Sequence, residues 1–210
     1  MSDGSAPIRI LAVDDHVLVR EGIALLVSTE PDLTLVGEAS NGREAIQQFR
    51  AHLPDVTLMD LQMPEMNGLD AINAIRGEFP DAKIIVLTTY KGDVQIVRAL
   101  KSGAQAYLLK NTLHKELAAA IRAVHAGKKM ISPEASFEIA EHATDDALTP
   151  AEIAVLRLIA AGNANKQIAD QLSITEDTVK SRVKSILSKL GANDRTHAAT
   201  IGLKRGIIEL

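Results

Sequence analysis

Three acidic side chains of this sequence follow apolar segments at points where they could act together. Asp14 and Asp15 come directly after Ile8–Val13, and Asp60 directly follows the apolar segment 55–59. If these segments are neighbouring strands of a parallel sheet, their carboxyl ends meet at one edge and the carboxylates converge. Carboxylate oxygens suit Mg²⁺, which shares its coordination sphere with phosphoryl groups. The spacing therefore predicts an acidic Mg²⁺ site beside a carboxylate nucleophile.

A basic side chain and a hydroxyl lie at the ends of two further apolar segments that are predicted to be strands. Lys110 follows Gln105–Leu109, and Thr88 is the last residue of Lys83–Thr88. Phosphoryl transfer requires a nucleophile, a metal ion, a fixed cation and oriented donors, which these residues could supply. Any one of the aspartates alone is explained equally well as a cap at the end of a strand. The five residues together predict a phosphoacceptor site.

The first 127 residues predict five strands separated by helices. The strands span Ile8–Val13, Leu33–Glu38, Asp55–Met59, Lys83–Thr88 and Gln105–Leu109. The helices span about 16–28, 42–52, 68–78, 92–101 and 113–126. Strands that are apolar almost throughout indicate a parallel sheet covered on both faces. The fold class predicted for 1–127 is a five-stranded, doubly wound α/β domain with strand order 2-1-3-4-5.

A small helical domain is predicted to follow a linker. Residues 128–147 are interpreted as this linker, with one short helix, and 148–210 as an all-α helix-turn-helix domain. Thr149, Pro150 and Glu152 form the pattern of a capping box at the start of its first helix. Two helices, Asn165–Leu172 and one from Thr175 to Leu190, are joined by a short turn, which is typical of DNA-reading elements.

The charge of the chain is distributed unevenly. The net charge is −4, but residues 148–210 contain nine Lys and Arg against six Asp and Glu. On the helix that follows the turn, Lys180, Ser181 and Lys184 share one face, with Arg182 to the side. A basic face suits DNA phosphates, although an isolated lysine-rich helix is more often simply solvated.

Four segments resemble the receiver domain of bacterial response regulators over about residues 8–126. They are Val13-Asp14-Asp15-His16, the run from Met59 to Gly68, Leu87-Thr88-Thr89 and Tyr107-Leu108-Leu109-Lys110. The resemblance implies that a sensor histidine kinase phosphorylates Asp60. It also implies a Mg²⁺ ion held by Asp15, Asp60 and the backbone carbonyl of Gln62, with Asp14 alongside.

The same resemblance implies a switch. Lys110 and Thr88 would bind the phosphoryl oxygens, and Tyr107 would turn inward when Thr88 moves to the phosphate. The alternative for Tyr107 is an ordinary half-buried strand residue. Asn111 stands where many receivers have proline, which leaves the cis peptide of those relatives open. His16 is expected to cap or pack the first helix rather than to bind metal.

Residues 148–206 resemble a LuxR-type DNA-binding domain, and the two resemblances together identify the NarL/FixJ family of response regulators. The motifs are Leu148–Glu152, Asn165–Ala169 and Thr178–Leu190. The residues that this resemblance brings to DNA are Lys180, Ser181 and Lys184 at base edges, and Lys166, Thr178 and Arg195 at phosphates. Arg182 stands where the family often has His or Tyr.

The expected function is a phosphorylation-controlled transcription regulator that binds double-stranded DNA as a homodimer and is not an enzyme. The last predicted helix, with Ala198, Ile201 and Leu203, is expected to pair the DNA-binding domains. RNA polymerase is a further expected partner. The polar, acidic start and the absence of about 18 consecutive apolar residues predict a cytoplasmic protein without a membrane partner.

Other function classes fit less well. A haloacid-dehalogenase-like phosphatase would need an aspartate at the position of Gln62. A flavodoxin-like nucleotide binder would need a Gly-rich or Ser/Thr-rich loop in place of Asp14-Asp15-His16. The absence of cysteine excludes disulfides and thiolate metal sites. The main alternative is an atypical receiver that is not phosphorylated and serves as a dimerisation or ligand module.

Overall fold

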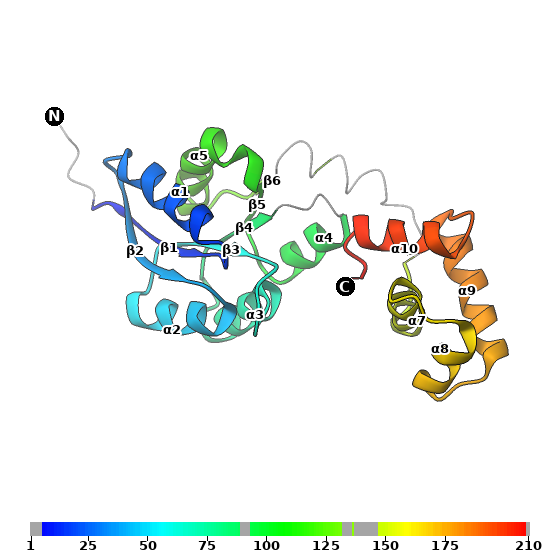
Figure 1. Cartoon of the computed structure of the whole chain (residues 1–210). Helices are drawn as coiled ribbons and strands as arrows, with labels where there is room; N and C mark the ends of the chain where they lie inside the picture. Colours follow the sequence, from blue (N-terminus) through cyan, green and yellow to red (C-terminus); the bar gives the residue numbers. More distant parts are fainter. Residues whose placement is uncertain (1–5, 89–92, 132–135, 137–146, 209–210) are drawn as a thin grey trace. The chain divides into compact units, whose positions relative to one another are not determined.

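The computed structural model describes residues 6–88, 93–131, 136 and 147–208. Their contacts divide the chain into two compact units (Figure 1). The first unit contains the sheet with α1–α3, α5 and most of α4, and the second contains α7–α10. Within the described residues, no helix combines the length and the apolar character that crossing a membrane requires.

The first unit is built on a parallel sheet with the strand order β2-β1-β3-β4-β5-β6. The strands are β1 (Ile8–Val13), β2 (Leu33–Ala39), β3 (Val56–Asp60), β4 (Ile84–Thr88), β5 (Ala106–Leu109) and β6 (Met130–Ile131). Every residue of β3, β4 and β5 is buried, which explains their continuous apolar character. The predicted α/β class and the order of the first five strands are confirmed.

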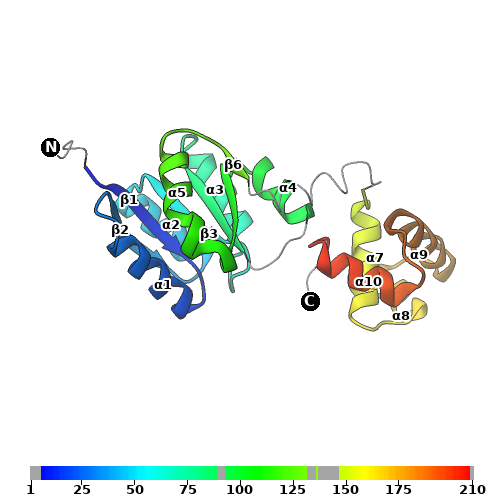
Figure 2. The same ribbon diagram turned by 90° about the horizontal axis from the view of Figure 1, so that it is seen from above.

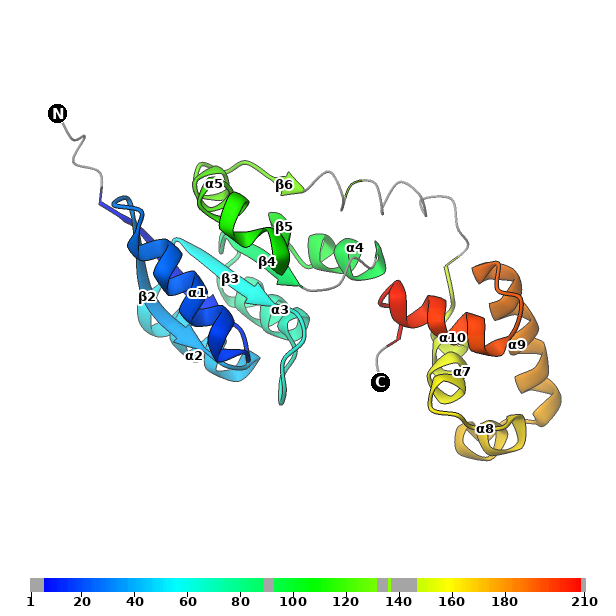
Figure 3. The same cartoon turned by 45° about the horizontal axis from the view of Figure 1, so that its top comes forward.

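Helices cover both faces of the sheet, with α1 and α5 on one face and α2 and α3 on the other (Figure 1 and Figure 3). The helices of this unit are α1 (Val17–Ser28), α2 (Gly42–His52), α3 (Gly68–Glu78), α4 (Asp93–Lys101), the 3-10 turn η1 (Lys110–Thr112) and α5 (Leu113–His125). Side chains of α1 and α5 pack with inward-facing residues of β1, β3 and β5 in one apolar cluster. This packing fixes the strand ends that bear the polar residues.

The prediction of five strands is wrong by one, because β6 pairs in parallel with β5. It lies within the segment interpreted as a linker, and the Met130 amide donates to the Gln105 carbonyl oxygen at 2.8 Å. Two residues are too few to show a strand periodicity in the sequence. Most of the short linker helix predicted within 128–147 lies outside the described residues.

The described part of the second unit, residues 147–208, contains four helices that Figure 2 shows from above. They are α7 (Pro150–Ala160), α8 (Asn165–Leu172), α9 (Glu176–Leu190) and α10 (Arg195–Lys204). Ser173, with φ of 53°, ends α8 in a left-handed conformation, and Thr175 caps α9. Apolar side chains from all four helices form one core. The predicted helix-turn-helix is therefore present as α8 and α9.

Candidate phosphoacceptor site and nucleic-acid interface

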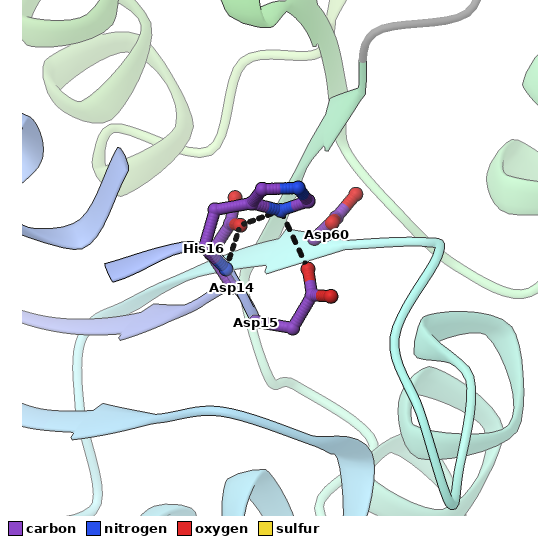
Figure 4. A group of neighbouring side chains, drawn as sticks. All are labelled: Asp14, Asp15, His16 and Asp60. Carbon is purple, nitrogen blue, oxygen red and sulfur yellow. Dashed lines mark hydrogen bonds and ion pairs between the residues drawn. The ribbon is translucent and has the colours of Figure 1, made fainter. Parts of the chain in front are cut away.

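The ends of two neighbouring strands bring the three predicted aspartates together. Asp14 and Asp15 follow β1, Asp60 ends β3, and these strands pair with Val13 opposite Met59. Asp14 and Asp60 are only 0% and 3% exposed. One ligand atom from each of Asp14, Asp15, His16 and Asp60 lies within 4.8 Å of the others (Figure 4). The cluster of carboxylates expected from the sequence is thus formed.

Lys110 lies between two of these carboxylates. Its Nζ is 2.6 Å from Oδ2 of Asp14 and 2.8 Å from Oδ2 of Asp60. Burial alone would lower the pKa of Lys110, but its close contacts with the two carboxylates raise the pKa above its usual value. Burial raises the pKa of Asp60 even though Lys110 opposes the shift. One lysine therefore does not fully compensate the negative charge of the site.

The donors fit a hard divalent cation. Oδ2 of Asp14 and Oδ1 of Asp15 are buried and accept no hydrogen bond of good geometry from the part of the chain that is described, although a side-chain nitrogen lies near each. Lys110 approaches the first at 2.6 Å, and His16 approaches the second at 2.7 Å. Buried carboxylate oxygens with unused lone pairs are the ligands that Mg²⁺ or Ca²⁺ takes in proteins.

A tight loop covers the Asp60 end of the site. A Cβ at Gly68 would overlap the carbonyl oxygen of Asp60, so only glycine allows α3 to begin this close to β3. The Gly68 amide donates to the Leu61 carbonyl oxygen at 3.0 Å. Gln62 lies within this loop, and its amide points to Oδ1 of Asp60 at 3.4 Å. Gln62 thus lies beside Asp60, and the role of its carbonyl oxygen as a Mg²⁺ ligand stays a prediction.

Thr88 and Tyr107 lie inside the same edge of the sheet. Thr88 is 1% exposed and Tyr107 is fully buried, which excludes the half-buried alternative for the tyrosine. Burial raises the pKa of Tyr107, and a hydrogen bond with the Thr88 side chain partly opposes this shift. A direct link between the predicted switch residues is therefore present, while the switching itself stays a prediction.

His16 belongs to the acidic cluster, although its sequence context predicts only a capping or packing role. It is the N-cap residue of α1, as expected, but its side chain makes no capping hydrogen bond. Its Nδ1 instead lies 2.7 Å from Oδ1 of Asp15 and 3.3 Å from Oδ1 of Asp14 (Figure 4). The sequence signal that could have indicated this contact is the position of His16 directly after Asp14 and Asp15, just before α1 begins.

The second unit exposes polar side chains on one face of α9. Lys180, Ser181 and Lys184 are exposed, whereas Arg182 is only partly exposed. Lys180 forms surface ion pairs with Asp177 at 3.1 Å and with Glu176 at 3.7 Å. Within the described ranges, no ion pair or side-chain hydrogen bond involves Lys184. Lys184 is therefore the more available of the two lysines for an external anion.

The residues predicted to bind phosphates differ in their surroundings. Lys166 is exposed in the first turn of α8. Thr178 shares a hydrogen bond of 2.8 Å between its hydroxyl and that of Thr175, the cap of α9. Arg195 is partly buried and donates from Nη2 to the Asn163 carbonyl oxygen at 2.6 Å. Arg195 thus already binds the loop after α7 within its own unit.

One expectation for α10 is wrong. Ala198 is fully buried in the core of its own unit, so its side chain cannot pair two DNA-binding domains. Ile201 and Leu203 are partly exposed. The spacing of apolar residues on a helix does not reveal which of them face the domain's own core.

A carboxylate of α7 holds α9 in place, which the sequence predicted only as a capping box. Both hydrogen bonds of the box between Glu152 and Thr149 are present. Oε1 of Glu152 also accepts a hydrogen bond from Ser185 at 2.6 Å, and Oε2 pairs with Lys189 at 2.9 Å. Burial opposes ionisation of Glu152, but these hydrogen bonds lower its pKa to about 2.

Two family models match this chain. The model described as "Response regulator receiver domain" matches residues 10–122, and the model "Bacterial regulatory proteins, luxR family" matches residues 146–201. Together they cover most of the two units described above.

Whole-length relatives and solved structures agree with these matches. The transcriptional regulatory protein YdfI of Bacillus subtilis is 42% identical over 96% of this chain and 98% of its own length. The response regulator protein VraR of Staphylococcus aureus is 38% identical over 96% and 99%. The structure of RcsB from Salmonella enterica serovar Typhimurium, bound to promoter P1flhDC with the phosphomimetic BeF3⁻, matches with a TM-score of 0.73 at 28% identity, over 95% of this chain and 98% of that chain. A structure of two RcsB dimers bound to two parallel DNAs gives 0.71 at 27% identity, over 94% and 98%.

Proposed function

Since the chain belongs to the response regulators that combine a receiver domain with a LuxR-type DNA-binding domain, we propose that phosphorylation of Asp60 controls its binding to promoter DNA. The observation that carries this proposal is the position of Asp60. Asp60 is the last residue of β3, and its carboxylate is buried beside Asp14 and paired with Lys110. The chain accepts a phosphoryl group here and catalyses no turnover of a separate substrate.

The chemistry follows from the surrounding side chains. A carboxylate oxygen of Asp60 attacks the phosphorus of a phosphohistidine on a sensor kinase, and the bond from phosphorus to the imidazole nitrogen breaks. Asp14, Asp15, Asp60 and the Gln62 carbonyl would hold Mg²⁺, which would neutralise charge on the phosphoryl oxygens. Lys110, now shared by two carboxylates, would move to a phosphoryl oxygen.

The change at Asp60 would then spread through the switch residues. When the Thr88 hydroxyl turns to the phosphoryl group, its hydrogen bond with Tyr107 breaks. Tyr107 would repack inside the sheet edge, and this rearrangement would favour a second arrangement of the receiver surface. The link between these two side chains supports this sequence of events.

For the binding of DNA by the second unit, we propose that α9 enters the major groove. Lys180, Ser181 and Lys184 would meet base edges, whereas Lys166, Thr178 and Arg195 would bind phosphates, with Arg182 beside them. The exposed face of α9 and the DNA-bound RcsB structures support this assignment.

Phosphorylation is proposed to favour a homodimer, as the DNA-bound RcsB dimers suggest. A dimer would place two α9 helices on two half-sites of one operator. The other proposed partners are a sensor histidine kinase and, at the promoter, RNA polymerase, and the proposed location is the cytoplasm. Lys110→Ala should retain some phosphorylation but lose the accompanying dimer formation, which sedimentation velocity would detect.

The direct test of the phosphoacceptor uses acetyl phosphate and Mg²⁺. Phos-tag electrophoresis should show a shifted band for the unaltered chain and for Asp70→Asn, which changes an exposed aspartate, but none for Asp60→Asn. Undiminished phosphorylation of Asp60→Asn would reject the assignment. An unaltered chain that accepts no phosphoryl group would favour the atypical, non-phosphorylated receiver.

A further inference from the structure

We propose that His16 is a nitrogen ligand of the cation in the acidic site, so that this site binds later first-row transition ions such as Ni²⁺ more tightly, relative to Mg²⁺, than its carboxylates alone would. The inference rests on the metal site of the proposed function and adds to it a residue that determines the choice of ion.

The geometry of the cluster carries this proposal. Nδ1 of His16 points toward the carboxylates, 2.7 Å from Oδ1 of Asp15 and 3.3 Å from Oδ1 of Asp14 (Figure 4). The most distant ligand atoms of Asp14, Asp15, His16 and Asp60 are within 4.8 Å. An octahedral ion with bonds of about 2.1 Å places opposite ligands about 4.2 Å apart. The widest separation among the four side chains therefore needs to close by at most about half an ångström for them to share one ion.

The backbone of His16 is fixed while its ring is accessible. The His16 amide donates to Oδ1 of Asp14 at 2.9 Å, and its carbonyl oxygen accepts from Val19 and Arg20 in the first turn of α1. Arg20 also donates from Nη1 to the Asp14 carbonyl oxygen at 2.6 Å, which holds the turn. The His16 side chain is 66% exposed. Its imidazole can therefore rotate toward an ion without moving the main chain.

The donor chemistry determines which ions gain from this ligand. Mg²⁺ prefers oxygen ligands and keeps much of its water, whereas imidazole nitrogen suits Ni²⁺ and the other later first-row ions. A different role is also open to this side chain, because an imidazolium could simply balance the charge of the aspartates. The two roles predict opposite effects when the ring is removed. Loss of a ligand weakens binding of Ni²⁺, whereas loss of a counter-cation strengthens binding of every divalent ion.

Calorimetric titration of the full chain with Mg²⁺ and with Ni²⁺, at one fixed and mildly alkaline pH, separates these roles. His16→Gln should lower the affinity for Ni²⁺ by about tenfold or more, since loss of even an outer-shell partner of a metal ligand costs about that much, and should change the affinity for Mg²⁺ far less. His125→Gln is the matched control, because His125 is exposed at the end of α5. It should change neither affinity.

Pulsed EPR of the chain loaded with Mn²⁺ gives a second readout. Modulation from a coordinated ¹⁴N nucleus should be present in the unaltered chain and in His125→Gln, and absent in His16→Gln. An unchanged ratio of Ni²⁺ to Mg²⁺ affinity, or tighter binding of both ions by His16→Gln, would overturn the assignment of His16 as a ligand. Intact ion binding without phosphorylation of Asp60 would instead overturn the proposed function and leave the ligand assignment standing.

Discussion

Two lysines of this chain show how burial separates the roles of one residue type. Lys110 is 9% exposed and is held between Asp14 and Asp60 at the edge of the sheet. Lys184 is exposed on α9, and no described residue forms an ion pair with it. The first lysine is part of a preorganised site, and the second is available to bind DNA.

The difference shows that charged side chains act differently when they are buried in the first unit and when they are exposed in the second. In the first unit, burial strengthens each electrostatic contact, so removal of one group leaves its partners without compensation. In the second unit, solvent and salt screen the exposed cations, so each is worth little until it meets a phosphate or a base. Substitutions in the two units should therefore differ in size and in salt dependence.

The largest effect is expected from Lys110→Met measured without Mg²⁺. Loss of this cation leaves two buried carboxylates unpaired, which should lower the free energy of unfolding by about 3–5 kcal/mol. Denaturant unfolding followed by circular dichroism measures the change. Lys115→Met, which alters an exposed lysine of α5, is the control and should stay close to the unaltered chain. Equal stability of the two variants would contradict the distinction between buried and exposed lysines.

The second prediction concerns Glu152, a buried acidic residue in the unit whose lysines are mostly exposed. Its hydrogen bonds lower the pKa to about 2, from an ordinary value of 4.5. The stabilisation is therefore fully present above pH 4.5 and is lost as the pH falls toward 2. Glu152→Gln should lower the free energy of unfolding by about 2–3 kcal/mol near neutral pH.

The pH dependence distinguishes this network from a surface ion pair. The difference between the unaltered chain and Glu152→Gln should shrink as the pH falls through that window. Glu176→Gln removes an exposed partner of Lys180 and should cost less than about 1 kcal/mol. Denaturant unfolding at a series of pH values measures both variants. A constant difference for Glu152→Gln across the window would show that its charge does not stabilise α7 against α9.

The sheet and the acidic site were largely predictable because both follow from the order of the strands. Apolar strands separated by helices allow few arrangements, and the carboxyl ends of β1 and β3 then bring Asp14 and Asp60 together. Tyr107 was placed correctly on β5, but its complete burial required the three-dimensional structure. The additional strand β6 escaped prediction because two residues carry no periodic signal.

Contacts between distant elements were not predictable from local patterns. The link from Glu152 to Ser185 and Lys189 joins residues more than 30 positions apart. The burial of Ala198 depends on how α10 packs against its neighbours. His16 was expected only to cap or pack the first helix, whereas its side chain lies among carboxylates. In each case, the surroundings of the residue depend on how elements distant in the sequence pack together.

A smaller effect is expected from the exposed lysines. Lys184→Ala should weaken operator binding by about 1–3 kcal/mol and reduce the ratio of operator to random-DNA affinity, since a base contact is lost. Lys166→Ala should weaken binding to both DNAs similarly and reduce the salt slope by about one unit. Competition binding over a salt series measures both. A full specificity ratio in Lys184→Ala would show that α9 meets DNA by another face, and Arg182 would be the next residue to test.

The central claim is that the buried carboxylate of the first unit controls the exposed lysines of the second. The most direct measurement is the affinity of the full chain for its operator, identified by selection from genomic fragments, with and without acetyl phosphate and Mg²⁺. The account predicts that the phosphodonor increases the affinity of the unaltered chain and leaves that of Asp60→Asn unchanged. The same increase in both proteins, or in neither, would contradict it.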